Sequence, residues 1–217
     1  MKFVITAGPT REPLDPVRYL SNRSSGKMGY AIASAALEGK HEVVLISGPV
    51  AIASPPGAEL LRVTTGDEMF AAASEHFYRC DIFVMCAAVC DYKPTNFSTK
   101  KMPKQKSNFA LELAPTRDIL ASLTRQPHRC FVIGFAAETQ NSQANARHKL
   151  KTKNCDLLVA NDVSGADSGI DSEENELLIV LPNEKPKTLS RAKKIVLARR
   201  LLKIILRARE NCLTKKT

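Results

Sequence analysis

The chain has 217 residues and a mass of 23.8 kDa, and 44% of its residues are hydrophobic and 25% charged. This composition is typical of a folded domain and excludes a disordered chain. No segment approaches the ~20 consecutive apolar residues of a membrane-spanning helix, and the N-terminus lacks the apolar region of a signal peptide. We therefore expect a cytoplasmic protein that makes no membrane contact.

The net charge of +10 is concentrated near the C-terminus. Residues 185–217 contain twelve Lys and Arg residues and a single acidic residue, Glu210, so this segment carries the whole positive excess. Such a segment could bind nucleic acid, or it could be the solvated face of a terminal helix. The second explanation is the more common one, so we do not expect nucleic acid as a partner.

Apolar runs typical of buried strands alternate along the chain with segments of helical periodicity. Strands are predicted at 3–7, 43–46, 82–85, 131–133, 157–159 and 177–181. Helices are predicted at 27–38, 67–78, 116–123 and 143–151, with a basic C-terminal helix and tail at about 188–217. This alternation predicts one α/β domain over 1–217, built on a Rossmann-like, doubly wound and mainly parallel sheet.

Two connections are longer than such a fold needs, at 7–26 and 91–107. Both follow the carboxyl ends of predicted strands, where ligands bind in open parallel sheets. The second connection contains four lysines that could contact a triphosphate or simply be solvated: Lys100, Lys101, Lys104 and Lys106.

Neither familiar phosphate-binding motif is complete. After the first strand only Gly8 is present, so the glycine pattern of dinucleotide sites is missing. The segment SNRSSGKMG at 21–29 is not a P-loop, because Met28 stands where Ser or Thr is needed. It could bind a phosphate or carboxylate at a helix N-terminus, or Ser24 or Ser25 could cap that helix; local physics favours neither.

In chain order, these segments resemble the phosphopantothenate-cysteine ligase family, also called phosphopantothenoylcysteine synthetase. The resemblance rests on eight segments: ITAGPTREPLDPVRYLSNRSSGKMGYAIA (5–33), LISGPV (45–50), AAVCDYKP (87–94), KMPK (101–104), DILA (118–121), GFAAET (134–139), KLKTK (149–153) and LVAND (158–162). It implies a ligase of coenzyme A biosynthesis. The family uses a nucleoside triphosphate and Mg²⁺ to activate 4'-phosphopantothenate as an acyl nucleotidylate, and L-cysteine then displaces the nucleoside monophosphate. The motifs resemble the bacterial form, which uses CTP and forms an acyl-CMP, rather than the eukaryotic form, which prefers ATP, so we expect CTP.

The resemblance also assigns residues. It implies that Asn22 assists turnover of the acyl intermediate and that Lys101 assists nucleotide activation. The implied phosphopantothenate site is Asn22, Arg23, Ser24, Ser25 and Gly26. The implied nucleotide site is Cys86, Ala87, Asp91, Lys101, Arg117, Asp118, Ile119, Leu120, Phe135, Lys149 and Lys153. No metal ligands are indicated, because triphosphate oxygens and water can hold Mg²⁺.

Three departures from the family pattern occur: Cys90 stands in place of Ala, Pro103-Lys104 in place of Lys-Lys, and Arg117 in place of Pro. The family comparison further leads us to expect a homodimer, no FMN, and a separate phosphopantothenoylcysteine decarboxylase. The alternative hypothesis is a non-catalytic nucleotide- or nucleic-acid-binding protein that uses the basic C-terminal segment.

Overall fold

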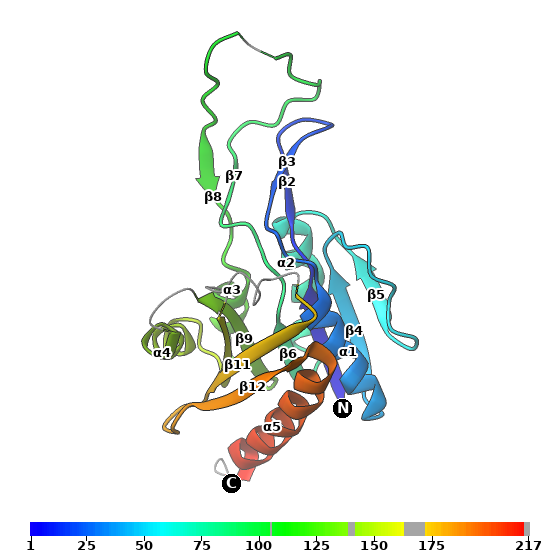
Figure 1. Ribbon diagram of the computed structural model, residues 1–217, viewed down its shortest axis with the longest axis vertical. Coiled ribbons are helices and arrows are strands. Elements are labelled where there is room, and N and C mark those ends of the chain that lie inside the picture. The colour runs from blue at the N-terminus through cyan, green and yellow to red at the C-terminus, as the bar shows by residue number, and fades with distance from the viewer. Residues whose placement is uncertain (105, 139–141, 163–171, 215–217) are drawn as a thin grey trace.

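The computed structural model describes residues 1–104, 106–138, 142–162 and 172–214 (Figure 1). Its main sheet has eight strands in the order β12-β11-β10-β9-β6-β1-β4-β5. Their bounds are β1 Lys2–Ala7, β4 Glu42–Ser47, β5 Glu59–Arg62, β6 Ile82–Met85, β9 Phe131–Glu138, β10 Leu157–Asp162, β11 Glu174–Val180 and β12 Lys187–Lys193. The neighbouring strands β5, β4, β1, β6, β9 and β10 pair in parallel, whereas β11 pairs antiparallel with both β10 and β12. The predicted α/β fold with a mainly parallel sheet is confirmed.

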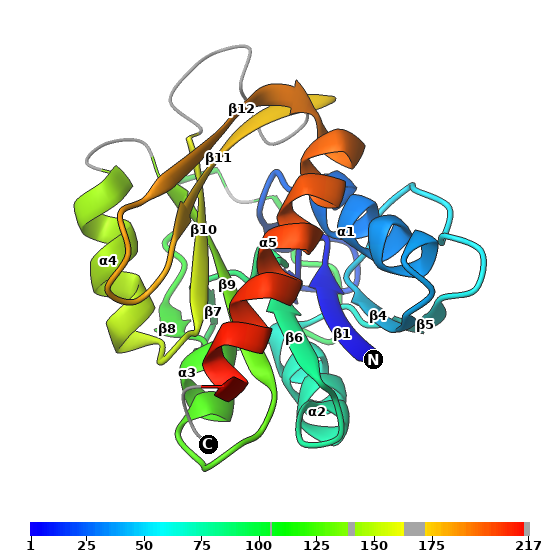
Figure 2. The ribbon, with the colours of Figure 1, turned by 90° about the horizontal axis from the view of Figure 1, so that it is seen from below.

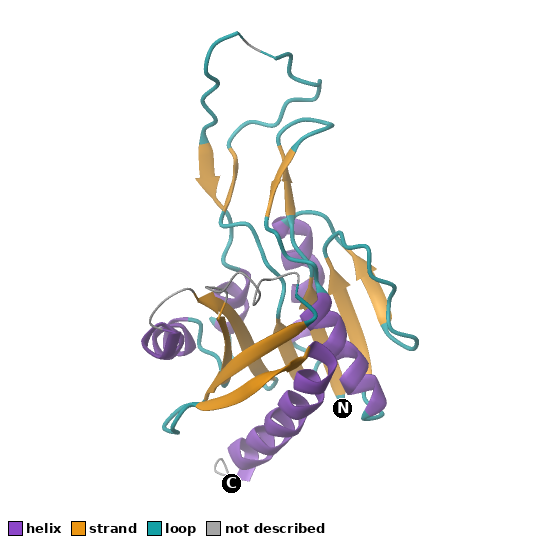
Figure 3. Cartoon of the chain, in the orientation of Figure 1, coloured by secondary structure: helices purple, strands orange, loops and turns teal. Residues whose placement is uncertain are grey.

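Helices cover both faces of the sheet (Figures 2 and 3). The helices α1 (Lys27–Glu38) and α5 (Lys194–Thr214) pack on one face. The other face is covered by α2 (Gly66–Phe77), α3 (Ile119–Thr124) and α4 (Ser142–Thr152). Side chains of β1 alternate accordingly, with Phe3 and Ile5 in the first core and Val4 in the second. A strand buried on both faces explains the continuous apolar runs in the sequence.

The chain changes direction across the sheet between β1 and β6. From β1 it runs outward through β4 to β5, and it then returns to the other side of β1 and continues through β6 and β9 to β10. The loops that follow β1 and β6 therefore diverge at the carboxyl edge, which is where open α/β sheets bind ligands.

Two arms extend from this edge, away from the body of the domain (Figure 1). The first arm is the hairpin of β2 (Arg11–Pro13) and β3 (Tyr19–Ser21). The second arm contains β7 (Tyr92–Pro94), β8 (Leu113–Pro115) and the described residues between them. The arms correspond to the two connections that were predicted to be unusually long.

The C-terminal helix begins later than the sequence pattern suggested. Residues 187–193 form β12, which pairs with β11, so α5 starts only at Lys194. The helix expected from residue 116 also begins later, at Ile119, because the Asp118 carboxylate accepts from the backbone N–H of Ala121 and caps it.

Candidate functional site

Two cavities adjoin at the carboxyl edge of the sheet. The larger has a volume of 520 Å³ and the smaller 240 Å³. Both are lined by Ala87, Val89, Asp91, Phe135 and Lys149, so the two cavities lie side by side and share these residues. The larger cavity alone reaches the segment at 22–29, and the smaller alone reaches the start of α3.

All five residues predicted to bind phosphopantothenate line the larger cavity: Asn22, Arg23, Ser24, Ser25 and Gly26. Gly26 is the N-cap of α1, with φ of 78°, so the N-cap position itself falls on a glycine and not on Ser24 or Ser25. Ser24 Oγ accepts from the backbone N–H of Gly26 at 3.3 Å. Because the first helical residues, Lys27 to Gly29, also line the cavity, the α1 N-terminus provides an anion-favouring wall.

The wall that follows β6 is held by two threonines from the first strand and its loop. Thr6 is fully buried, and its Oγ1 accepts from the backbone N–H groups of Cys86 and Ala87, both at 3.2 Å. Thr10 Oγ1 accepts from the N–H of Cys90 at 3.0 Å. These bonds satisfy backbone donors where the regular ladder of β6 ends. Asn22 Nδ2 in turn donates to Ala88 O at 3.0 Å, which joins the segment at 22–29 to this loop.

Most of the nucleotide residues predicted from the sequence line the smaller cavity, whereas Cys86 lines only the larger one and Ala87 lines both. Asp91, Asp118, Ile119, Leu120, Phe135, Lys149 and Lys153 all line the smaller cavity. Lys153 of the α4 C-terminal turn forms an ion pair with Asp118, which caps α3. An aromatic ring, an aliphatic floor and two lysines suit a planar base with attached phosphates.

Two predicted site residues lie elsewhere. The guanidinium of Arg117 stacks over the ring of Phe70 on α2, 4.2 Å from its centroid, and Arg117 lines neither cavity. Lys101 belongs to the second arm and also lines neither cavity.

The residues that line the larger cavity without having been assigned from the sequence include three polar ones from the β10–β12 side of the sheet: Asn161, Asn175 and Lys194. Lys194 is only 6% exposed and Asn175 only 3%. Asn161 Oδ1 is buried without a hydrogen-bond partner in the described structure. Asn161 lies in the quoted LVAND segment, but nothing local in the sequence distinguishes Lys194 from the other lysines of the basic segment.

Cys86 in the larger cavity and the nearby Cys90 both have thiols whose pKa is raised. All six cysteines of the chain are free. Burial raises the pKa of Cys86 to about 12, and burial also raises the pKa of Cys90. The thiol at position 90, which departs from the family pattern, is thus a packed side chain that contacts Thr10 O.

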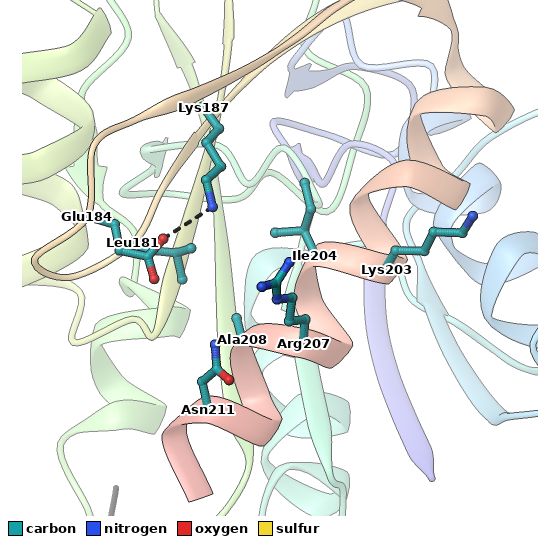
Figure 4. Close-up of a pocket in the computed structure, with 8 residues that line it drawn as sticks. All are labelled: Leu181, Glu184, Lys187, Lys203, Ile204, Arg207, Ala208 and Asn211. Carbon is teal, nitrogen blue, oxygen red and sulfur yellow. Dashed lines mark hydrogen bonds and ion pairs between the residues drawn. The ribbon is translucent and has the colours of Figure 1, made fainter. Parts of the chain in front are cut away.

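The basic C-terminal segment is largely part of the fold. The apolar stripe of α5 is buried, and Arg199 and Arg209 form ion pairs with Glu38 and Asp81. A cavity of 290 Å³ between the β11–β12 hairpin and α5 is lined by Lys187, Lys203 and Arg207, with Lys187 paired to Glu184 (Figure 4).

In the ranges that the structure describes, we find no group of three His, Cys, Asp or Glu side chains placed to hold a metal ion. In those same ranges, none of the helices combines the length and apolar character needed to cross a bilayer.

Comparison with known proteins places the chain in a family. Residues 1–208 match the family described as DNA/pantothenate metabolism flavoprotein C-terminal domain. The chain is 44% identical over 200 residues to the coenzyme A biosynthesis bifunctional protein CoaBC of Escherichia coli K12, a match that covers 87% of this chain and 49% of that protein. It is 45% identical over 177 residues to CoaBC of Bacillus subtilis, which covers 81% of this chain and 44% of that protein.

A solved structure is also similar. The crystal structure of the C-terminal domain of CoaBC superimposes with a TM-score of 0.83 at 36% identity, and the match covers 97% of this chain and 96% of that one. The chain spans about half the length of the curated relatives it matches. The chain therefore belongs to the DNA/pantothenate metabolism flavoprotein C-terminal domain family.

The role of Thr6 can be tested by Thr6→Val, which keeps the shape of the side chain and removes its acceptor. We expect a loss of about 2 kcal/mol or more in the free energy of unfolding, because two N–H groups at the site lose their partner. Urea unfolding measures this, with Thr188→Val on the exposed strand β12 as the matched control. Equal stability of the two variants would contradict the assignment.

Proposed function

We propose that this chain is a phosphopantothenate-cysteine ligase of coenzyme A biosynthesis. The observation that carries the proposal is the adjoining pair of cavities, which brings the segment at 22–29 and the predicted nucleotide residues to one edge of the sheet. The similarity to CoaBC proteins over most of this chain supports the same reaction.

In this proposal CTP occupies the smaller cavity. Phe135 would pack against the base, Asp91 would accept from the ribose, and Lys149 and Lys153 would approach phosphates. Mg²⁺ would be held mainly by triphosphate oxygens and water and would neutralise phosphate charge. The two carboxylates that line that cavity have other roles, because Asp91 would bind the ribose and Asp118 caps α3 and pairs with Lys153. The reaction would take place in the cytoplasm.

The acyl group would lie in the larger cavity, beside Asn22. The Asn22 amide donates to Ala88 O through Nδ2, so this side chain is fixed in the wall of the larger cavity. A fixed amide donor can stabilise the acyl oxygen as it becomes an oxyanion during attack by the cysteine amine. The N-terminal amides of α1 would favour the anionic groups of the substrate.

We further propose a homodimer that forms through the arms. Six of the large hydrophobic side chains that are exposed in the described structure lie on the arms: Val17, Tyr19, Tyr92, Phe97, Phe109 and Leu113. Apolar side chains gathered on protruding segments are typical of a subunit interface. Since Lys101 lies on the second arm and lines neither cavity, it would serve the site of the second copy.

The first experiment is pyrophosphate release by the purified protein with 4'-phosphopantothenate and Mg²⁺. CTP and ATP are supplied in parallel, each with and without L-cysteine. We expect cysteine-dependent turnover with CTP. Turnover with ATP alone would overturn the choice of nucleotide, and absence of release with either nucleotide would overturn the ligase function.

The role of Asn22 is tested by Asn22→Asp. We expect the acyl-CMP to form and its transfer to cysteine to slow by about 10²–10³-fold, because an acceptor replaces the donor that faces the oxyanion. Single-turnover kinetics separate the two steps. Asn211→Asp on the exposed end of α5 introduces the same charge away from the site and is expected to behave as wild type.

The role of Lys101 is tested by Lys101→Gln, which removes its charge. We expect pyrophosphate release from CTP to fall at least about tenfold, since the developing phosphate charge loses a counter-ion. Lys104→Gln on the same arm is the comparison. Normal release by the first variant and slow release by the second would transfer the role to Lys104.

A further inference from the structure

A buried carboxylate joins the two arms. Asp15 in the turn of the first arm is 3% exposed. Its Oδ1 accepts from the backbone N–H groups of Val17 at 2.9 Å and Arg18 at 2.8 Å. Its Oδ2 accepts from Arg18 Nε at 2.9 Å, Arg18 Nη2 at 2.5 Å and the backbone N–H of Met102 at 3.1 Å. Thus one oxygen forms the turn and the other connects the turn to the second arm.

Arg18 makes a second hydrogen bond between the two arms, to the carbonyl group of Met102. Its Nη2 also donates to Met102 O at 2.7 Å. The Asp15–Arg18 pair therefore binds both the N–H and the C=O of a single peptide residue, Met102, which directly follows Lys101. Two-point binding of this kind fixes the orientation of the backbone as well as its position.

A second tie lies three residues before Lys101. The backbone N–H of Ser98 donates to Leu14 O at 3.1 Å, again in the turn of the first arm. Ser98 Oγ donates to Lys100 O at 2.6 Å and closes the short loop between the two ties. The backbone of Lys101 is thus held on both sides by the first arm.

The pair is suited to remain charged. The hydrogen bonds from Arg18 hold the pKa of the Asp15 carboxyl well below its usual range. A guanidinium is always protonated, so both partners are ionised at neutral pH. A lysine side chain has a long flexible stem, and the placement of its backbone decides which part of a site the ammonium can reach.

We propose that Asp15 is a positioning residue that, together with Arg18, clamps the Met102 peptide and so fixes where Lys101 is presented. The catalytic consequence rests on the proposed function, because the role of Lys101 is part of it. The clamp itself is defined by contacts within this chain and is tested separately.

The test variant is Asp15→Asn. An asparagine can keep Oδ1 on the turn amides, but its NH₂ group then faces the Arg18 guanidinium and the Met102 N–H, which are donors themselves. We expect the amide hydrogen exchange of Met102 to accelerate by about 10- to 100-fold. The control is Glu38→Gln, which removes a comparable Arg–carboxylate pair between α1 and α5. Unchanged exchange at Met102 in Asp15→Asn would overturn the clamp.

Pyrophosphate release gives the second readout. We expect kcat to fall about tenfold in Asp15→Asn with a change of less than about twofold in the KM for CTP, because Lys101 is misplaced and the nucleotide cavity is intact. Faster exchange with an unchanged kcat would overturn the positioning role. If the wild-type protein releases no pyrophosphate, the proposed function fails, and the exchange experiment still decides on the clamp.

Arg18→Lys is the second variant, for use where Asp15→Asn does not fold. It keeps the positive charge beside Asp15, but an ammonium lacks the planar fork that reaches Asp15 and Met102 O together. We expect faster exchange at Met102 with the turn amides at positions 17 and 18 still protected. Protection of Met102 equal to that of wild type would contradict the clamp.

Discussion

The site depends on the parallel pairing of β1 with β6. At this point in the sheet the chain reverses its direction of progress, and the loops after both strands leave the ladder with unpaired backbone donors. Thr6 and Thr10 accept from those donors, and the backbone of Ala88 bonds to both Gly8 and Thr10. The cavity walls are therefore continuous with the hydrogen bonding of the sheet.

Local patterns predicted the features that depend on neighbouring residues. The parallel strands and the helix at 27–38 are examples. A strand buried on both faces appears as a short apolar run, and a helix appears as apolar residues at helical spacing, so both can be recognised from a short segment. The residues of 22–26, which the motif singled out, line a cavity. Long-range packing decided the rest. Arg117 stacks on Phe70, which is 47 positions earlier, and the burial of Lys194 comes from elements that meet only in the folded chain.

The basic C-terminal segment shows why charge alone is a weak guide to function. Apart from the buried Lys194, the lysines and arginines of α5 alternate with the apolar residues that bury the helix against the sheet, so their charges lie away from the apolar stripe. Arg199 and Arg209 then bind acidic residues of the body. The apolar stripe of α5 packs on the sheet, and part of its basic face is paired with acidic residues of the body. These two features account for the basic composition of the segment without a polyanionic partner.

The arms combine two properties that are costly in isolation. They expose large apolar side chains to solvent, and at the point where they meet they carry the buried carboxylate of Asp15, which is paired with the exposed Arg18. A second copy of the chain would cover the apolar side chains, and the Asp15–Arg18 pair would then hold Lys101 in a defined place relative to that copy. In the proposed dimer, separation of the subunits would remove this lysine from the neighbouring site, so assembly and nucleotide activation would be linked through the same two segments.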